Sequence, residues 1–170
     1  MRTTGHNGSR RAFLTGRLKR PEPTPSLPWV LRDQFWDRCT RCGDCAAACP
    51  EDIIKPGSGS YPEISFADAG CTFCGDCARA CPEALFSDPS GRPWDQVARI
   101  GETCLMAGNV FCQSCAETCA EEAIAFDWTA GRTLPPKIDA DRCTGCGQCV
   151  APCPVDAITV ASGRETRGHV

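Results

Sequence analysis

Sixteen of the 170 residues are cysteines, and they fall into four groups of four with none left over. Three groups share one spacing: two residues separate the first three cysteines, three residues precede the fourth, and proline follows. The members of these regular groups are Cys39, Cys42, Cys45 and Cys49; Cys71, Cys74, Cys77 and Cys81; and Cys143, Cys146, Cys149 and Cys153. Thiols in such repeated patterns form disulfides, hold zinc or hold iron–sulfur clusters.

The spacing distinguishes these three chemistries. Disulfides need an oxidising compartment and normally a secretory signal, which we do not expect here, and cysteines three residues apart are too close together to pair comfortably. Structural zinc is usually held by two separated pairs of cysteines. An uninterrupted run of three, followed by a fourth before proline, is typical of [4Fe-4S] ligation in bacterial ferredoxins. We therefore expect [4Fe-4S] clusters at the three regular groups.

The remaining group is irregular. It consists of Cys104, Cys112, Cys115 and Cys119, with seven residues between the first two cysteines and Ala120 in place of proline. One interpretation is a degenerate repeat whose cysteines are buried as small apolar side chains. The other is a fourth cluster, because all four cysteines are present and the group ends with the regular spacing. We expect the fourth cluster, with the degenerate repeat as the alternative.

The fourth cysteine of each group should serve the neighbouring cluster, as it does in two-cluster ferredoxins. We expect Cys49 to join Cys71, Cys74 and Cys77, and Cys81 to join Cys39, Cys42 and Cys45. By the same rule Cys119 should join Cys143, Cys146 and Cys149, and Cys153 should join Cys104, Cys112 and Cys115. All sixteen cysteines are thus predicted cluster ligands, and no catalytic residue is expected.

Short apolar segments must position these loops. Each group is followed by a turn and a short apolar run, which predicts a strand. We expect one hairpin from residues 53–54 and 61–66, joined at 57–60, and another from 124–126 and 137–139, joined at 130–132. Turn residues at 88–93 break the chain, and residues 94–100 are expected to form a short helix.

Composition indicates that the clusters replace an apolar core. Leu, Ile, Val and Phe number only seven each, too few for an ordinary core, although the net charge of −3 does not favour disorder. The expected fold class is α+β, with small, cluster-stabilised tandem modules of the bacterial two-[4Fe-4S] ferredoxin type. The expected boundaries are a basic, proline-rich arm at 1–32, modules at 33–87 and 100–161, a linker with a short helix at 88–99, and a tail at 162–170.

Five aromatic residues are expected to pack around clusters or to seal the interface between the modules. They are Trp36, Phe73, Trp94, Phe111 and Trp128.

Most other functions lack support in the sequence. Its two histidines, His6 and His169, lie near the ends, no glycine-rich nucleotide loop follows a strand, and no apolar run is long enough to span a membrane. Residues 1–20 carry six bases and no acid, which leaves nucleic-acid binding as a weakly supported alternative. Arg10 and Arg11 lie in a pattern similar to a twin-arginine export signal, but prolines stand where that signal needs apolar residues. We expect an uncleaved chain, whose arginine pair is either a chance pattern or a surface recognised by a partner.

The chain resembles the NapF family over residues 9–160. The resemblance rests on six short segments, on the proline-rich spacer near Trp29 and on the irregular third group. The segments are 9–17 (SRRAFLTGR), 39–42 (CTRC), 57–62 (GSGSYP), 71–74 (CTFC), 81–87 (CPEALFS) and 153–158 (CPVDAI). The resemblance implies a cytoplasmic ferredoxin-type accessory protein that acts on the catalytic subunit of periplasmic nitrate reductase before its export, in acquiring or reducing that subunit's own [4Fe-4S] centre. The family's agreed ligands are the three regular groups. The rival interpretation is a general electron carrier to a reductase.

Overall fold

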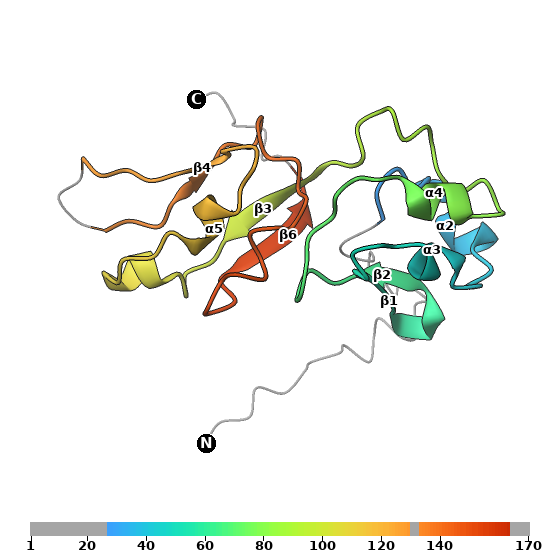
Figure 1. Cartoon of the computed structure of the whole chain (residues 1–170), viewed down its shortest axis with the longest axis horizontal. Coiled ribbons are helices and arrows are strands. Elements are labelled where there is room, and N and C mark those ends of the chain that lie inside the picture. Colours follow the sequence, from blue (N-terminus) through green and yellow to red (C-terminus); the bar gives the residue numbers. More distant parts are fainter. Residues whose placement is uncertain (1–26, 130–132, 164–170) are drawn as a thin grey trace, which may run out of the picture.

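The computed structural model describes residues 27–129 and 133–163. The ribbon has two lobes, the first formed by residues 27–87 and the second by residues 96–163 (Figure 1). All described elements are short, and the longest helix, α2 (Arg32–Arg38), has seven residues. Within the described residues, therefore, no helix is long and apolar enough to cross a membrane.

The first lobe places its cysteines on loops around one hairpin. Strands β1 (Ile54–Pro56) and β2 (Pro62–Ile64) pair antiparallel, with Ile54 opposite Ile64, and the 3-10 turn η1 (Ser58–Ser60) joins them. Two one-turn helices, α3 (Asp44–Ala47) and α4 (Asp76–Ala80), lie in the cysteine segments before and after this hairpin. The first hairpin expected from the sequence is confirmed.

The second lobe repeats this plan. Strands β4 (Ile124–Ala125) and β5 (Lys137–Ile138) form its hairpin, as expected, although the expected turn at 130–132 lies outside the described residues. The one-turn helix α5 (Ser114–Glu117) precedes the hairpin, and the insertion after Cys104 forms the 3-10 turn η2 (Leu105–Gly108).

The helix expected over residues 94–100 is wrong. Residues Gln96–Ile100 form strand β3, which pairs antiparallel with β6 (Ile158–Ser162), so that Ile100 lies opposite Ile158. The backbone groups of β3 form hydrogen bonds with a segment far along the chain, and this pairing overrides the helix expected from the local sequence. The second lobe therefore begins earlier than residue 100, and the expected linker of 88–99 is too long. β6 also extends to Ser162, into the expected tail.

The expected arm is also too long at its C-terminal end. Leu27 and Trp29 are only 2% and 5% exposed. The backbone N–H of Leu31 donates to the carbonyl of Leu85 at 2.8 Å, and Val30 forms an isolated β-bridge with Phe86. This short apolar segment is folded because it covers the apolar side of the first lobe. The rest of the arm, including Arg10 and Arg11, and residues 164–170 of the tail lie outside the described residues.

Both lobes close in the same way. The first segment of each lobe pairs with its last: Val30 with Phe86, and β3 with β6. The hairpin and the two cysteine loops lie between those paired ends. The expected α+β fold of two small cysteine-rich units is thus what the chain forms.

Cysteines are part of the core. One cluster of buried side chains is centred on Ile53, Ile54, Phe66 and Trp94, and it includes Cys77. A smaller cluster contains Cys149 with Ala98 and Ile158. Val160 of β6 packs into the first cluster, so the two lobes share apolar contacts. Thiols thus supply part of the buried surface in a chain with few aliphatic residues.

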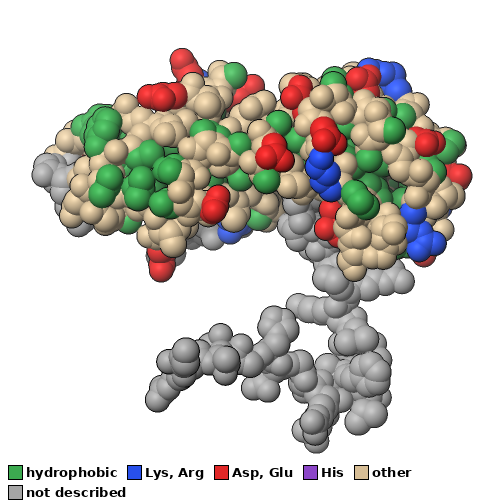
Figure 2. Space-filling model, turned by 60° about the horizontal axis from the view of Figure 1, so that its bottom comes forward, with side chains coloured by type: hydrophobic (Ala, Val, Ile, Leu, Met, Phe, Trp, Pro, Cys, Tyr) green, Lys and Arg blue, Asp and Glu red, His purple; other side chains and the backbone are tan. Residues whose placement is uncertain are grey.

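The aromatic residues divide into two sets. Phe73 and Trp94 meet edge to face at 5.5 Å beside the second lobe, and Trp36 packs on Phe35 and Tyr61. In contrast, Phe111 and Trp128 are 65% and 51% exposed and stack on each other, so they do not seal the interface between the lobes, and their packing against a cluster stays a prediction. Figure 2 shows hydrophobic side chains gathered on the surface of the second lobe.

Candidate iron–sulfur sites

Four cavities each bring together a set of four thiols, three from one group and the fourth cysteine of its neighbour, and Cys71 also lines the cavity of the last set. The four sets are site one (Cys39, Cys42, Cys45 and Cys81), site two (Cys49, Cys71, Cys74 and Cys77), site three (Cys104, Cys112, Cys115 and Cys153) and site four (Cys119, Cys143, Cys146 and Cys149). This grouping is the exchange of fourth cysteines that the sequence predicts. The irregular third group takes part in it on the same terms as the others.

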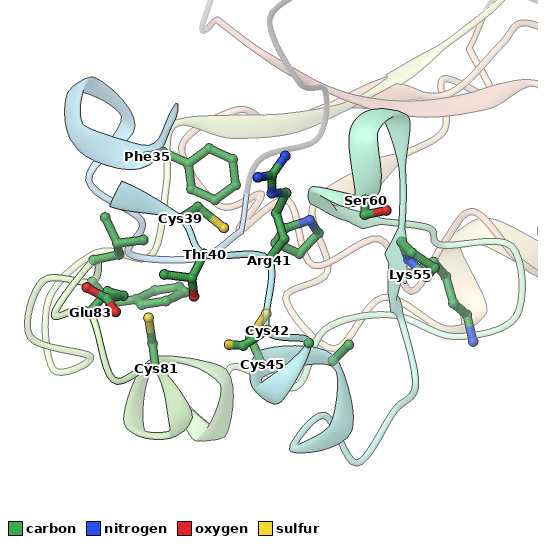
Figure 3. Close-up of a pocket in the computed structure, with 16 residues that line it drawn as sticks. Phe35, Cys39, Thr40, Arg41, Cys42, Cys45, Lys55, Ser60, Cys81 and Glu83 are labelled. Atoms are coloured by element: carbon green, nitrogen blue, oxygen red, sulfur yellow. The ribbon is translucent and has the colours of Figure 1, made fainter. Parts of the chain in front are cut away.

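Site one shows the arrangement most openly. Its four cysteines surround one space between the loop after α2 and the end of α4 (Figure 3). Arg41 and Lys55 also contribute to the lining, although Figure 3 shows the Lys55 ammonium group pointing away from the sulfurs. Cys42 is exposed to solvent, so this site reaches the surface of the protein.

Left-handed backbone shapes the cysteine loops of the regular groups. The residue before the second cysteine has a φ of 60° at Arg41, 55° at Phe73 and 72° at Gly145. The residue after the second cysteine is always glycine, with a φ between 79° and 87°. Glycine adopts this region without steric cost, and the resulting curl turns successive thiols toward one space. The irregular group differs, because Gln113 follows its second cysteine with a φ of −130°.

A second recurring bend lies three residues after each fourth cysteine. Asp52, Ala84, Glu122 and Asp156 all have a φ close to 50°. Here the chain leaves the cysteine loop and enters the short apolar segment that follows. Because the fourth cysteine stands at this exit, its thiol lies at the neighbouring site rather than at that of its own group.

Backbone amides donate to several cysteine sulfurs. In the second lobe, Ala123 N–H donates to Cys119 Sγ at 3.4 Å and Ala157 N–H donates to Cys153 Sγ at 3.2 Å. Cys143 Sγ accepts from Ala98 N–H, and Cys71 Sγ accepts from Phe73 N–H, both at 3.4 Å. Hydrogen bonds to ligand sulfur stabilise negative charge and are a principal control of cluster potential.

Burial raises the pKa of several thiols. It is the main cause that raises the pKa of Cys45 to about 11 and the pKa of Cys77 and Cys149 to about 12. Neighbouring cysteines in the same site add to this shift. A thiol of this kind becomes a thiolate when iron takes the place of its proton, so cluster uptake must release protons.

The donor set suits an iron–sulfur cube better than a single ion. Across residues 27–129 and 133–163, no three Cys, His, Asp or Glu side chains converge closely enough to hold one metal ion. A zinc ion would need all its thiolates within about 2.3 Å of one point. A cube is bound through a different iron by each thiolate, so it suits four thiols spread around a space. Whether these cysteines ligate iron stays a prediction.

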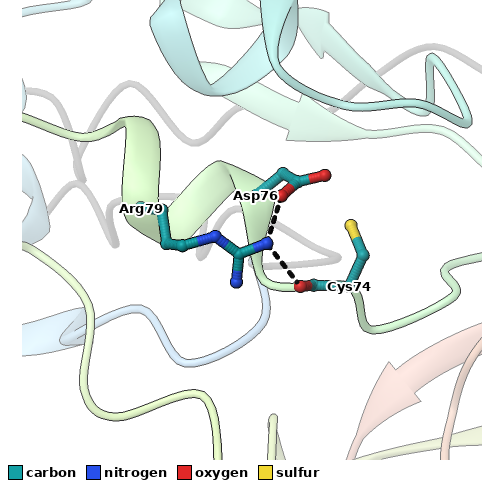
Figure 4. Close-up of polar contacts among 3 residues, drawn as sticks. All are labelled: Cys74, Asp76 and Arg79. Atoms are coloured by element: carbon teal, nitrogen blue, oxygen red, sulfur yellow. Dashed lines mark hydrogen bonds and ion pairs between the residues drawn. The ribbon is translucent and has the colours of Figure 1, made fainter.

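One charged residue beside site two was not predicted from the sequence. The Arg79 guanidinium forms an ion pair with Asp76 and donates to the carbonyl oxygen of Cys74 at 3.0 Å (Figure 4). It lies on α4, between the third and fourth cysteines of its group. The available signal was its position, because a base inside a cysteine group must lie close to the site.

Two family models match the chain. The model of a 4Fe-4S dicluster domain matches residues 38–85, and that of a 4Fe-4S binding domain matches residues 136–159. Together they confirm that this is a 4Fe-4S protein. The irregular third group lies between the two matched ranges.

Known proteins resemble the chain over most of its length. The ferredoxin-type protein NapF of Escherichia coli K12 is 41% identical over 154 residues, which cover 90% of this chain and 94% of the relative. The ferredoxin-type protein NapF of Haemophilus influenzae is also 41% identical, over 78% of this chain and 76% of the relative. The methylamine utilization ferredoxin-type protein MauM of Methylorubrum extorquens is 32% identical over 77% of this chain and 66% of the relative.

Proposed function

The chain belongs to the NapF family of ferredoxin-type proteins, and from this premise we propose that it assists the maturation of a periplasmic nitrate reductase. It is a ferredoxin-type 4Fe-4S protein rather than an enzyme. In the proposed role it acts in the cytoplasm on the catalytic subunit, before that subunit is exported. It supplies either a [4Fe-4S] cluster or the electrons that such a cluster needs.

The observation that carries this proposal is the extent of the similarity. It covers 90% of the chain at 41% identity, so it includes both lobes. The ferredoxin motifs alone indicate a cluster protein and do not select a partner. The partner and the compartment are inferred from family membership.

We further propose that sites one to four each hold one cluster, with all sixteen cysteines as ligands. Support comes from the four cavities, each of which brings together three thiols of one group and the fourth cysteine of its neighbour. When bound, such a cluster accepts and returns one electron at a time. The protein's own contribution is to fix the thiols on curled loops, to donate amide hydrogen bonds to sulfur and to exclude most water from Cys77 and Cys149.

A general electron carrier is the second candidate. It is favoured by the exposure of Cys42 and Cys74, which brings sites one and two to the surface, where a redox partner could approach. A carrier would exchange electrons in brief encounters. A maturation factor would instead form a complex with the cofactor-poor form of its client.

The decisive experiment is a pull-down from cytoplasm with the tagged full-length chain. We expect it to retain the cofactor-poor catalytic subunit and to leave the mature enzyme unbound. An unrelated exported precursor with its own twin-arginine signal is the control, because it tests whether the signal alone is recognised. Equal retention of both forms of the subunit, or of neither, would contradict the maturation role.

A further inference from the structure

Sites two and four touch through the backbone. The N–H of Cys71, a residue of site two, donates to the carbonyl oxygen of Cys146, a residue of site four, at 2.7 Å. Cys71, Thr72 and Phe73 also line the cavity of site four. Cys71 therefore lies at both sites, although the two belong to different lobes.

Close packing fixes this contact. A Cβ atom on Gly70 would lie 2.6 Å from the backbone nitrogen of Gln148, and one on Gly147 would lie 2.4 Å from the ring of Phe66. Both contacts run from one lobe to the other, and both leave room only for hydrogen. Distances this short require something to shift when a side chain is added, so the interface depends on the absence of side chains at these two positions.

A tryptophan reinforces the same interface. Trp94 is 8% exposed and packs edge to face on Phe73 and on Phe66 of the first lobe. Its indole Nε1–H donates to the carbonyl oxygen of Thr144, beside site four, at 2.8 Å. The segment between the lobes is therefore part of a packed interface, and the two lobes have a defined relative position.

The exchange of fourth cysteines joins the remaining sites. Cys49 and Cys81 interlock sites one and two, because each follows the loop of one site and lines the other. Cys119 and Cys153 interlock sites three and four in the same way. With the contact between Cys71 and Cys146, the order of the sites in space becomes one, two, four, three.

We propose that the four sites form one continuous electron-transfer chain, in which the contact between Cys71 and Cys146 joins the two lobes. The proposal rests on the proposed occupancy of these sites by clusters. At the junction, one electron leaves the reduced cluster at site two, which is oxidised, and enters the oxidised cluster at site four, which is reduced. No bond breaks and no proton moves, and the step runs in either direction.

The structure provides a short connection for this step. It runs from the Cys71 side chain to its amide, across the hydrogen bond, and through the Cys146 carbonyl to the second side chain. Sites one and three are then the two ends of this electron-transfer chain. An electron accepted at one lobe becomes available at the far end of the other, so the protein acts as one carrier instead of two.

The test compares two alanine variants of the full-length, cluster-loaded chain. Gly70→Ala places a methyl group against Gln148 across the junction, and the φ of Gly70 is not left-handed, so its own backbone is unstrained. Gly108→Ala is the matched control, since a Cβ there meets nothing within 4 Å. Iron content is measured first, and a value near that of the wild type shows that each variant folds.

The readouts are pulsed electron paramagnetic resonance of the dithionite-reduced protein and hydrogen exchange of the Cys71 amide. In the wild type and in G108A we expect a protected amide and fast spin relaxation from neighbouring clusters. In G70A we expect faster exchange of that amide and a severalfold slower relaxation for part of the spins. The three atoms nearest to the added methyl group of G70A all belong to Gln148 in the other lobe, so the difference reports the junction.

Unchanged relaxation in G70A, while the Cys71 amide becomes exposed, would overturn the proposal. So would a wild-type protein whose Cys71 amide exchanges freely. If G70A loses iron, Trp94→Phe takes its place: it removes the hydrogen bond to Thr144 and part of the ring that packs on Phe66 and Phe73, and a smaller slowing of relaxation is expected. None of these measurements involves nitrate reductase, so a failed pull-down and a failed junction remain distinguishable.

Discussion

Cys49 and Cys81 each lie at the site of the other's cysteine group. Cys49 lies with the three thiols that follow it in the sequence, and Cys81 lies with three that precede it. Neither site in the first lobe has four thiols until both cysteine groups and the hairpin between them have folded. The two sites are therefore one structural unit, and removal of either cysteine should take a thiol from the other group's site.

The first prediction concerns the number of clusters. The anaerobically purified chain should contain about sixteen iron atoms and as much acid-labile sulfide, since each of four clusters holds ~4 of each. Colorimetric iron and sulfide assays, normalised to amino-acid analysis, measure this. A value near twelve would mean that the irregular third group binds no cluster.

The exchange of fourth cysteines between sites can be tested by asking whether the iron losses of two variants add. Cys49→Ser and Cys71→Ser remove ligands of the same predicted cluster, so the double variant should lose no more iron than one of the singles. Cys49→Ser with Cys42→Ser removes ligands of two different clusters, and their iron losses should add, because each variant takes one ligand from a different cube. Additive loss in the first pair would show that Cys49 binds elsewhere.

Cluster removal should unfold the chain. With so few aliphatic residues, binding of clusters supplies most of the folding free energy, as in other small metal-dependent domains. We expect that chelation under anaerobic, reducing conditions abolishes the cooperative transition in scanning calorimetry. Persistence of that transition in iron-free protein would show that the apolar contacts around Ile53 and Trp94 suffice.

Arg79 should raise the reduction potential at site two. Arg79→Gln removes a positive charge whose guanidinium reaches the Cys74 carbonyl. Because this guanidinium is exposed and paired with Asp76, we expect the potential to fall by only about 10–40 mV, the equivalent of a surface charge interaction. Redox titration monitored by electron paramagnetic resonance checks this. Arg99→Gln is the control, since Arg99 bonds to residues 162 and 163, and its potentials should stay unchanged.

Arg10 and Arg11 should affect binding and leave cluster content unchanged. Replacing both by Ala should leave iron unaltered and weaken retention of the catalytic subunit modestly, most of all at low salt. The reason is that exposed charges are screened over about 10 Å at 0.1 M salt. Pull-downs at two salt concentrations measure this. A variant that loses iron would show that these residues are needed for folding or cluster uptake.

Cysteine spacing was the most informative part of the sequence. The three-residue steps and the fourth cysteine before proline follow from how a cube is bound, so the grouping of Cys49 with Cys71 could be predicted. Both hairpins could be predicted as well, because glycine and polar turn residues separate short apolar runs. These features depend on local sequence.

The features that were missed depend on distant partners. β3 was expected to be helical because nothing near residues 96–100 reveals that residues 158–162 pair with them. Leu27 and Trp29 were assigned to the arm because the prolines around them resemble a spacer, whereas their burial depends on the segment 85–93. The contact between Cys71 and Cys146 depends on how two lobes pack, which spacing within each cysteine group does not encode.

The pairing of first and last segments has a consequence for biosynthesis. Phe86, the partner of Val30, leaves the ribosome before any of the second lobe is complete, so the first lobe can close and receive its clusters on the nascent chain. β3 must wait for β6, and site three must wait for Cys153, both close to the C-terminal end. Cluster delivery during translation would therefore fill sites one and two first. A stop codon just before Cys153 would leave a cluster-loaded first lobe attached to a second lobe that cannot close.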